Sequence, residues 1–188
     1  MAKVYEFLAD GFEEIEALLP VDILRRGGVA IQTVSVTGSE LVTSSHGVTI
    51  KADLLFENAD LSDADMLLLP GGLPGATNLN EHEGVRKALT EQNAKGKRIG
   101  AICAAPMVLG SLGLLHGRKA TCSPGFEKYM DGAEYTAQLF QEDGNIITGE
   151  GPAATFPYAY RILSYFIGDE RVKNYEVKMQ YAHLMERK

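Results

Sequence analysis

Cys103 is the residue whose surroundings most favour covalent chemistry. It follows the apolar run of residues 98–102 and precedes Ala104, Ala105 and Pro106. Small residues two positions before and after a thiol match a nucleophile elbow, a tight strand-to-helix turn, with Cys in place of Ser. At a helix start, unpaired N–H groups and the helix dipole are expected to lower the thiol pKa from ~8.5. The alternative is a buried structural cysteine, the commoner role of a lone intracellular thiol.

Glu16 is a carboxylate on the apolar face of a predicted helix at residues 13–26. It shares one stripe of that helix with Phe12, Leu19 and Ile23. A carboxyl group buried there tends to keep its proton, because burial disfavours the charged form. The protonated acid could then hydrogen-bond a thiolate without charge repulsion. The alternative is a partly exposed Glu whose aliphatic stem lies along the core.

Two glycines, Gly71 and Gly72, follow Pro70 directly after a short apolar run at residues 65–69. Glycines at the end of a buried strand leave backbone N–H groups free to face a ligand, which is how an oxyanion site is built. A simple turn is the alternative. The sequence contains neither a dinucleotide-binding glycine motif nor a Walker motif, so nucleotide binding has no support.

None of the four histidines adjoins Cys103 in sequence, although a thiol nucleophile commonly uses a histidine base. No pair of them has metal-ligand spacing, and no metal or cofactor is predicted. His46 is the most interesting, because its loop could reach a cleft or a subunit interface. Cys122 lacks the turn context of Cys103, so we predict a structural role for it.

Apolar patterning predicts alternating strands and helices around a mostly parallel sheet. Pro20 cannot donate to the carbonyl of Glu16, so a kink or restart is expected in the first helix. The first strand contains one polar residue, Glu6. The expected strands span residues 4–9, 29–36, 65–69, 98–102, 119–122, 134–140 and 145–148, with a hairpin at 37–56; the expected helices span 13–26, 80–95, 104–115 and 156–168, with a helical tail to 188.

Composition limits the classes of function. The chain has 188 residues, which fits one domain at 1–188, and its net charge is −7. An acidic chain without a basic cluster is a poor candidate for binding nucleic acid or anionic lipid. The N-terminus lacks the apolar region of a signal peptide, and no segment reaches the ~20 apolar residues that span a bilayer. We therefore expect a cytoplasmic protein with reduced thiols and no membrane partner.

The sequence resembles the ThiJ/PfpI superfamily over essentially its whole length. The similarity rests on Gly-Phe-Glu-Glu-Ile-Glu-Ala at 11–17 with Pro-Val-Asp at 20–22, Leu-Leu-Pro-Gly-Gly at 68–72, and Ala-Ile-Cys-Ala-Ala at 101–105. Gly-Glu-Gly-Pro at 149–152 and the late helix extend it. Within the superfamily, it is most similar to the branch of the parkinsonism-associated deglycase and its bacterial relatives.

The resemblance implies a flavodoxin-like α/β sandwich, like that of class I glutamine amidotransferases, and a homodimer. It places the reactive cysteine of the family at Cys103 and its partner glutamate at Glu16. It also implies oxyanion contacts from the backbone of Gly71, Gly72 and Ala104.

Three positions distinguish this sequence within the superfamily. Peptidases of the PfpI type and the stress-chaperone branch have a His directly after the cysteine, where this sequence has Ala104. The deglycase branch often has a His before the Pro that follows the cysteine helix, and here that residue is Ser123. A family position from which a basic residue approaches the site of the partner subunit falls on His46.

The leading hypothesis is a cofactor-free enzyme that acts on reactive dicarbonyls or glycated adducts, with a small aldehyde or dicarbonyl as substrate. Cys103 would be the nucleophile and a protonated Glu16 the proton-transfer partner. An alternative is a redox-responsive stress or chaperone protein that uses oxidation of Cys103. A cysteine peptidase or amidohydrolase is disfavoured by Ala104.

Overall fold

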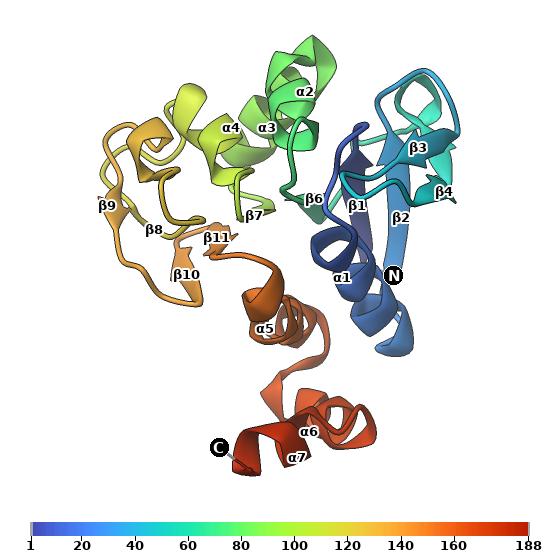
Figure 1. Ribbon diagram of the computed structural model, residues 1–188, viewed down its shortest axis with the longest axis vertical. Coiled ribbons are helices and arrows are strands. Elements are labelled where there is room, and N and C mark those ends of the chain that lie inside the picture. The colour runs from blue at the N-terminus through green and yellow to red at the C-terminus, as the bar shows by residue number, and fades with distance from the viewer. Residues whose placement is uncertain (1, 188) are drawn as a thin grey trace.

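Seven strands form the central sheet of the protein, whose computed structural model describes residues 2–187 (Figure 1). They are β1 (Lys3–Leu8), β2 (Ala30–Ser35), β5 (Leu54–Leu55), β6 (Met66–Leu69), β7 (Arg98–Ile102), β10 (Phe140–Asp143) and β11 (Ile146–Gly149). The strand order is β10-β11-β7-β6-β1-β2-β5, and only the β10–β11 pair is antiparallel. The mostly parallel α/β fold predicted from the sequence is therefore confirmed.

Helices cover both faces of the sheet (Figure 1). One face packs against α1 (Glu14–Arg26) and α5 (Thr155–Ile167), and the other packs against α2 (Gly75–Glu81), α3 (Glu83–Ala94) and α4 (Pro106–Ser111). The helix α6 (Asp169–Lys178) packs on α5 and is followed by α7 (Tyr181–Glu186). No helix within residues 2–187 is both long enough and apolar enough to cross a membrane.

Short elements complete the architecture. The hairpin of β3 (Leu41–Thr43) and β4 (Thr49–Lys51) covers the start of α1. A second small sheet pairs β8 (Lys119–Ala120) with β9 (Glu134–Tyr135). The 3-10 turns are η1 (Phe56–Asn58), η2 (Glu127–Tyr129) and η3 (Pro152–Ala154).

The central strands are apolar on both sides because both faces of the sheet are buried. In β6, Met66 and Leu68 face α1 and α5, whereas Leu67 and Leu69 belong to the core beneath the opposite helices. All four are at most 1% exposed. This strand therefore reads as a continuous apolar run instead of an alternating one.

Three predicted helices differ in the structure. The first is continuous through Pro20, which is buried, so the loss of one backbone hydrogen bond does not divide α1. The helix predicted at 80–95 is divided at His82, whose extended backbone ends α2 and whose Nδ1 accepts the Val85 N–H at 3.1 Å to cap α3. The helix predicted at 104–115 is shorter, since α4 begins at Pro106 and ends at Ser111.

Other boundaries also differ from the prediction. The two-residue strand β5 joins the edge of the main sheet, although its residues were expected within a hairpin excursion. The predicted helical tail divides into α6 and α7, joined through Gln180, which has a left-handed φ of 56°. The end of that predicted tail, residue 188, lies outside the described residues.

The strand order reverses direction beside β1. The chain passes from β1 outward to β2 and later returns to place β6 on the other side of β1. At such a switch point the loops after neighbouring parallel strands diverge, and ligands bind beyond the carboxyl ends of the strands. The segments after β1, β6 and β7 carry Glu16, Gly71 and Cys103, so the topology gathers the three predicted site regions at one edge.

Candidate active site

Cys103 lies in the turn directly after β7, with a left-handed φ of 63°. An L-residue seldom adopts this conformation, which costs of order 1–2 kcal/mol. Two backbone hydrogen bonds hold it: its N–H donates to the carbonyl of Gly149 at 2.9 Å, and its carbonyl accepts from the N–H of Ser123 at 2.9 Å. The side chain is half-buried. The cysteine is thus fixed at the carboxyl edge of the sheet by β11 and by the segment after β8.

Glu16 is fully buried, at 0% exposure, in the first turn of α1. Its Oε2 accepts the N–H of Gly71 at 2.9 Å, whereas its Oε1 has no hydrogen-bond partner within the described residues. The backbone N–H of Glu16 donates to the carboxylate of Glu13, which caps the helix, at 2.8 Å. The structure therefore favours a buried side chain over an aliphatic stem lying along the core.

Gly71 lies where these groups converge. A Cβ atom at Gly71 would lie 2.6 Å from Oε2 of Glu16, 2.7 Å from Cβ of Cys103 and 3.0 Å from the amide nitrogen of Ala104. Distances this short exclude a side chain at position 71. Only glycine allows the carboxyl group and the cysteine to approach each other across the end of β6.

Burial raises the pKa of the Glu16 carboxyl to about 7, because its charged form loses hydration. The Cys103 thiol opposes this rise by hydrogen bonding, Glu13 adds to it by charge repulsion, and the Gly71 N–H opposes it. Near neutral pH, Glu16 therefore exchanges its proton readily. A carboxyl group in this range suits general acid–base chemistry.

Burial also raises the pKa of the Cys103 thiol to about 12, and the negative charge of Glu16 adds to that rise. The N–H groups of Gly72 and Ala104 act in the opposite direction. The lowered pKa expected for a thiol at a helix start is thus not found. The helix α4 begins only at Pro106 and has six residues, so its dipole acts weakly on the sulfur.

Cys103 and Glu16 form a coupled pair, because the negative charge of Glu16 raises the pKa of the thiol and the hydrogen bond of the thiol lowers the pKa of the carboxyl group. Loss of one proton gives either a thiol beside a carboxylate or a thiolate beside a carboxylic acid, and both forms carry the same total charge. The N–H groups of Gly72 and Ala104 stabilise the thiolate form. The Gly71 N–H is already engaged with Glu16.

Ser123 and His46 have different relations to this pair. Ser123 contacts Cys103 through its backbone N–H and is half-buried. His46 lies at the hairpin turn with its side chain 72% exposed, and its Nδ1 is 2.8 Å from Oε2 of Glu14. This pairing raises the pKa of His46. Within one chain, His46 is tied to Glu14 and does not contact the cysteine.

One group of side chains has metal-ligating geometry that sequence spacing did not reveal. The ligand atoms of Glu13, Glu14 and His46 all lie within 4.8 Å of one another. They come from the start of α1 and from the hairpin, so only the fold brings them together. Their hydrogen bonds already use one Glu13 oxygen, both Glu14 oxygens and the imidazole Nδ1.

Two buried polar groups beneath the site were also missed as functional candidates. Glu6 is 1% exposed in β1, and its Oε2 has no hydrogen-bond partner within the described residues. The Tyr158 hydroxyl on α5 is likewise buried without a partner and occupies the space above Gly100. Both side chains lie on the side of the sheet covered by α1 and α5. For Glu6, the sequence signal that could have revealed it is a single acid inside an apolar strand.

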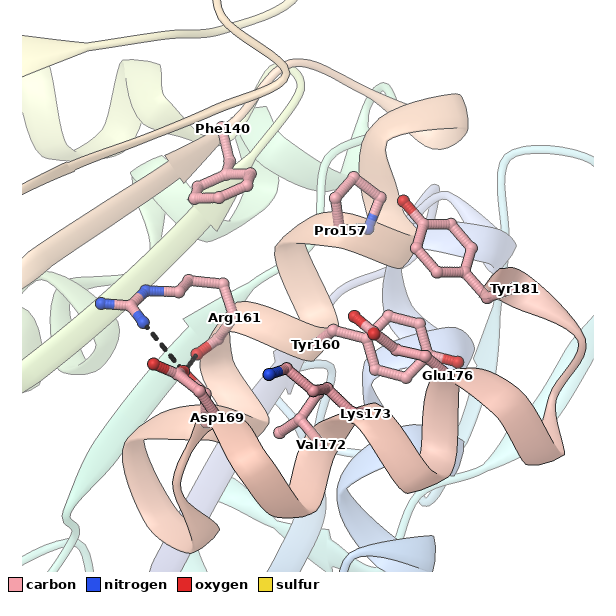
Figure 2. Close-up of a pocket in the computed structure, with 10 residues that line it drawn as sticks. Phe140, Pro157, Tyr160, Arg161, Asp169, Val172, Lys173, Glu176 and Tyr181 are labelled. Atoms are coloured by element: carbon pink, nitrogen blue, oxygen red, sulfur yellow. Dashed lines mark hydrogen bonds and ion pairs between the residues drawn. The ribbon is translucent and has the colours of Figure 1, made fainter. Parts of the chain in front are cut away.

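A separate groove lies between α5, α6 and β10 (Figure 2). Figure 2 shows the ion pair between Arg161 and Asp169, 3.4 Å apart, on one side and the rings of Tyr160 and Tyr181 on the other. Cys103 and Glu16 do not line it. The lining residues are Phe140, Pro157, Tyr160, Arg161, Ser164, Asp169, Val172, Lys173, Glu176 and Tyr181.

Comparison with protein families matches residues 2–165 to the DJ-1/PfpI family. The chain belongs to the DJ-1/PfpI family. The groove of Figure 2 is formed partly by α6 and α7, which lie beyond the family-matched segment. Cys103, Glu16, Gly71 and Gly72 all lie within the family-matched segment, residues 2–165.

Family relatives span animals, plants and archaea. The chain is 39% identical over 167 residues to a Parkinson disease protein 7 homolog of Danio rerio, covering 87% of this chain and 88% of the relative. It is 33% identical over 161 residues to a deglycase of Pyrococcus horikoshii, covering 83% and 94%. It is 36% identical over 171 residues to the protein DJ-1 homolog B of Arabidopsis thaliana, covering 90% of this chain and 39% of that longer protein.

Solved structures of the family superpose closely. The crystal structure of a cysteine-to-alanine mutant of a DJ-1 superfamily protein from Salmonella typhimurium matches with a TM-score of 0.91 and 34% identity, covering 96% of this chain and 98% of that one. Oxidized DJ-1 of Toxoplasma gondii matches with a TM-score of 0.92 and 33% identity, covering 97% and 100%. The family and the fold are thus shown by independent comparisons.

Proposed function

We propose that this DJ-1/PfpI protein is a cofactor-independent enzyme acting on reactive dicarbonyls or early glycation adducts, with Cys103 as nucleophile. The observation that carries the proposal is a fully buried carboxyl group, Glu16, beside a cysteine held in a left-handed turn. Family relatives named deglycases support an enzymatic role. The pair needs no nucleotide or metal for the chemistry below.

The first step joins the Cys103 thiolate to the aldehyde carbon of a methylglyoxal-like substrate. The new bond places negative charge on the former carbonyl oxygen. The N–H groups of Gly72 and Ala104, which face the sulfur in the free protein, are the donors we assign to this oxyanion. Glu16 then gives its proton to the oxygen and leaves a neutral hemithioacetal.

The second step moves a proton between the two substrate carbons. The Glu16 carboxylate removes the hydrogen from the carbon bonded to sulfur, and the resulting enediol is protonated at the neighbouring carbon. The product is the thioester of a 2-hydroxy acid. Water hydrolyses this thioester, which releases the hydroxy acid and restores the thiol. The net reaction is addition of one water molecule to the dicarbonyl with rearrangement to lactate.

The test is lactate formation from methylglyoxal by wild type, Cys103→Ala and Glu16→Gln. We expect both variants to lose at least a hundredfold in kcat/KM, because each removes a group that touches the reacting atoms. Cys122→Ala is the matched control, since Cys122 is fully buried and is expected to retain activity. Full activity of Cys103→Ala or Glu16→Gln would contradict the proposal.

A second candidate is a redox-responsive protein in which Cys103 is the sensor. The Gly72 and Ala104 N–H groups that face the sulfur could also bind the oxygens of a sulfinate. Two molecules of hydrogen peroxide would each transfer one oxygen atom to the sulfur and leave as water. Mild peroxide followed by intact mass and peptide mapping tests this. Addition of two oxygens at Cys103, without dicarbonyl turnover, would favour the sensor over the enzyme.

We also propose that the protein acts as a homodimer through the outer face of α1 and the β3–β4 hairpin. Ile15 and Leu18 on α1 are 51% and 36% exposed, and Val48 beyond the hairpin turn is 49% exposed. His46 lies between the hairpin strands, where a second subunit would meet it. Sedimentation equilibrium of wild type and Ile15→Glu tests this: we expect a dimer that dissociates in the variant, and a monomeric wild type would contradict it.

A further inference from the structure

Three buried polar atoms are unpaired on the side of the sheet that α1 and α5 cover. They are Oε2 of Glu6, Oε1 of Glu16 and the hydroxyl of Tyr158, and none has a hydrogen-bond partner within the described residues. Each of the three side chains is at most 1% exposed. Because buried polar groups are almost always hydrogen-bonded to protein or to ordered water, three unpaired atoms on one side of the sheet call for a shared partner.

The register of the sheet places Glu6 and Tyr158 over neighbouring strands. Glu6 in β1 pairs with Leu68 in β6, and Leu68 pairs with Gly100 in β7. Paired residues of parallel strands point to the same face, and the ends of this row are two strands, or about 10 Å, apart. Gly100 leaves its space on this face to Tyr158, since a Cβ at Gly100 would lie 2.5 Å from the Tyr158 hydroxyl. The phenol oxygen therefore lies directly against the sheet, in the row of Glu6.

Glu16 reaches the same side of the sheet from α1, and its two oxygens have different neighbours. A Cβ at Gly71 would lie 2.6 Å from Oε2, whereas a Cβ at Gly151 would lie 4.0 Å from Oε1. Gly151 precedes α5, and its carbonyl accepts the hydroxyl of Thr155, in the first turn of that helix, at 3.3 Å. Tyr158 is three residues further along α5, on the same face as Thr155. Oε1 therefore lies toward the start of the helix that carries Tyr158.

The charges of these groups also act on one another. Burial raises the pKa of Tyr158 most, and the charges of Glu6, Tyr165 and Glu16 add to that rise. Burial likewise raises the pKa of Glu6, and the charge of Glu16 adds to it. Both raised pKa values favour the protonated forms, which carry O–H donors. The titratable groups around the three unpaired atoms are Glu6 on β1, Glu13 and Glu16 at the start of α1, Cys103 after β7, and Tyr158 and Tyr165 on α5.

Oε1 of Glu16 is an acceptor that needs a donor. Oε2 already accepts the N–H of Gly71 at 2.9 Å, and it is the oxygen that Gly71 brings toward Cys103. Tyr158 and protonated Glu6 supply O–H donors on this side, and neither bonds Oε1 directly within residues 2–187. A water molecule accepts two hydrogen bonds and donates two. One water between these groups can therefore accept both O–H groups and donate to Oε1.

We propose that Tyr158 and Glu6 are positioning residues for Glu16, which they hold through an internal water molecule bonded to Oε1. With Oε1 held in this way, the proton that Glu16 gives or takes is carried by Oε2, the oxygen on the side of Cys103. Neither residue touches the substrate, and each acts only through Glu16. For turnover this rests on the proposed function, but for the proton affinity of Glu16 it does not.

Loss of the Tyr158 hydroxyl should raise the pKa of Glu16, because a donated hydrogen bond stabilises the carboxylate more than the neutral acid. Starting from a pKa of about 7, we expect a rise of about one pH unit in Tyr158→Phe. Glu6→Gln should leave this pKa nearly unchanged, because the amide N–H can replace the donor, whereas Glu6→Leu should raise it. The pH profile of kcat/KM for methylglyoxal should move by the same amount as the pKa.

Carbon-13 NMR of protein labelled at the glutamate carboxyl carbons measures this pKa directly, and the Glu16 resonance is identified by its loss in Glu16→Gln. Tyr160→Phe is the matched control. The Tyr160 hydroxyl is also buried on α5 without a partner within the described residues, but Tyr160 lines the groove of Figure 2. This variant should leave the pKa of Glu16 unchanged. Far-UV circular dichroism confirms that each variant is folded.

An unchanged Glu16 pKa in Tyr158→Phe, or an equal rise in Tyr160→Phe, would overturn the proposal. A high-resolution crystal structure of the wild type should show a water within ~3.2 Å of both Oε1 of Glu16 and the Tyr158 hydroxyl. Its absence would overturn the proposal even if no variant folds. A raised pKa in Tyr158→Phe without methylglyoxal turnover by the wild type would remove the proposed enzyme but leave the positioning role intact. Turnover by the wild type with an unmoved pKa in Tyr158→Phe would do the reverse.

Discussion

Glu16 and Glu6 are two buried acids on the same side of the sheet, and they differ in what surrounds them. Glu16 is 0% exposed and Glu6 is 1% exposed, and each has a carboxyl oxygen without a partner within the described residues. Glu16 receives an N–H from Gly71 and contacts the Cys103 thiol, which limits its pKa to about 7. Burial raises the pKa of Glu6 well above its ordinary value, and the charge of Glu16 raises it further.

The comparison of Glu16 with Glu6 distinguishes the effect of burial on a carboxyl pKa from the effect of hydrogen bonding. Burial makes both acids neutral in mildly acidic solution, because the interior solvates a carboxylate poorly. Hydrogen bonding to the charged form then returns only Glu16 to a pKa at which it can both give and take a proton. Glu6 has the burial without these hydrogen bonds, so its pKa stays well above the ordinary value.

Turnover provides the largest test of this contrast. Glu16→Gln should reduce kcat/KM for methylglyoxal by ~10²–10⁴, the usual contribution of a positioned acid or base. Glu6→Gln should change it by less than about threefold, since the amide retains the size and neutrality of the protonated acid. A loss in Glu6→Gln equal to that in Glu16→Gln, with both variants folded, would end the distinction.

Stability should depend on pH through both buried acids. A raised pKa in the folded state means that the unfolded chain loses its proton first, so stability falls as pH rises above ~4.5. For Glu16 this fall should end near pH 7 and total about 3 kcal/mol. For Glu6 the fall has the same direction, because burial raises its pKa well above the ordinary value.

Urea denaturation of wild type, Glu16→Gln and Glu6→Gln at pH 5, 7 and 8.5 measures these slopes. Each Gln variant should gain stability relative to wild type as pH rises. Above pH 7 the gain of Glu16→Gln should level off, because the Glu16 pKa is about 7. If the stability of all three proteins changed with pH in the same way, burial would not have raised the pKa of either carboxyl group.

Gly71→Ala tests whether the close approach of the Gly71 backbone to Glu16 causes the difference between Glu16 and Glu6. The added Cβ would meet Glu16, Cys103 and Ala104 at 3.0 Å or less, so we expect a loss of about 2 kcal/mol and a lower rate of Cys103 alkylation. Gly113→Ala is the control, because its left-handed φ of 70° adds strain but its Cβ meets no atom within 4 Å. Unchanged Cys103 alkylation in Gly71→Ala would contradict the assigned convergence.

The smallest effect on stability is expected from Glu14, which lies in the first turn of α1 with Glu16. Partial burial raises the pKa of Glu14, but hydrogen bonds from Ser44 and His46 outweigh it and lower that pKa to about 2. The pairing raises the pKa of His46, so its contribution should be lost as pH increases through that raised value. Thermal denaturation of His46→Ala should therefore differ from wild type below pH 6 and match it at pH 9.

Sequence patterning predicted the components that depend on the chain near each residue. The apolar stripe around Glu16, the glycines after a buried run, and the small residues around Cys103 each placed one component at the carboxyl end of a strand. The resemblance to a known family then implied that these three components belong to one site. Parallel order brings such ends together, so the convergence at Gly71 followed from local patterns and a general property of parallel sheets.

Features that depend on distant packing were not predictable from local pattern. The raised pKa of Cys103 arises from burial and from Glu16, which outweigh the local helix start. The division of the predicted helix at His82 depends on a side-chain cap that periodicity does not record. The hydrogen bond from Cys103 to the carbonyl of Gly149 requires the register of β11 against β7, in which Gly149 pairs with Ile102.

The hydrogen bond from Cys103 to Gly149 has a consequence for the protein during its synthesis. During synthesis Cys103 is added to the chain before Gly149, whose carbonyl fixes the Cys103 backbone. Translation of the segment between them takes roughly a few seconds at ~5–20 residues per second. Throughout that interval β11 cannot pair with β7, so the backbone of Cys103 lacks its hydrogen bond to Gly149. The left-handed turn at Cys103 is therefore completed late, when the last strand of the sheet pairs with β7.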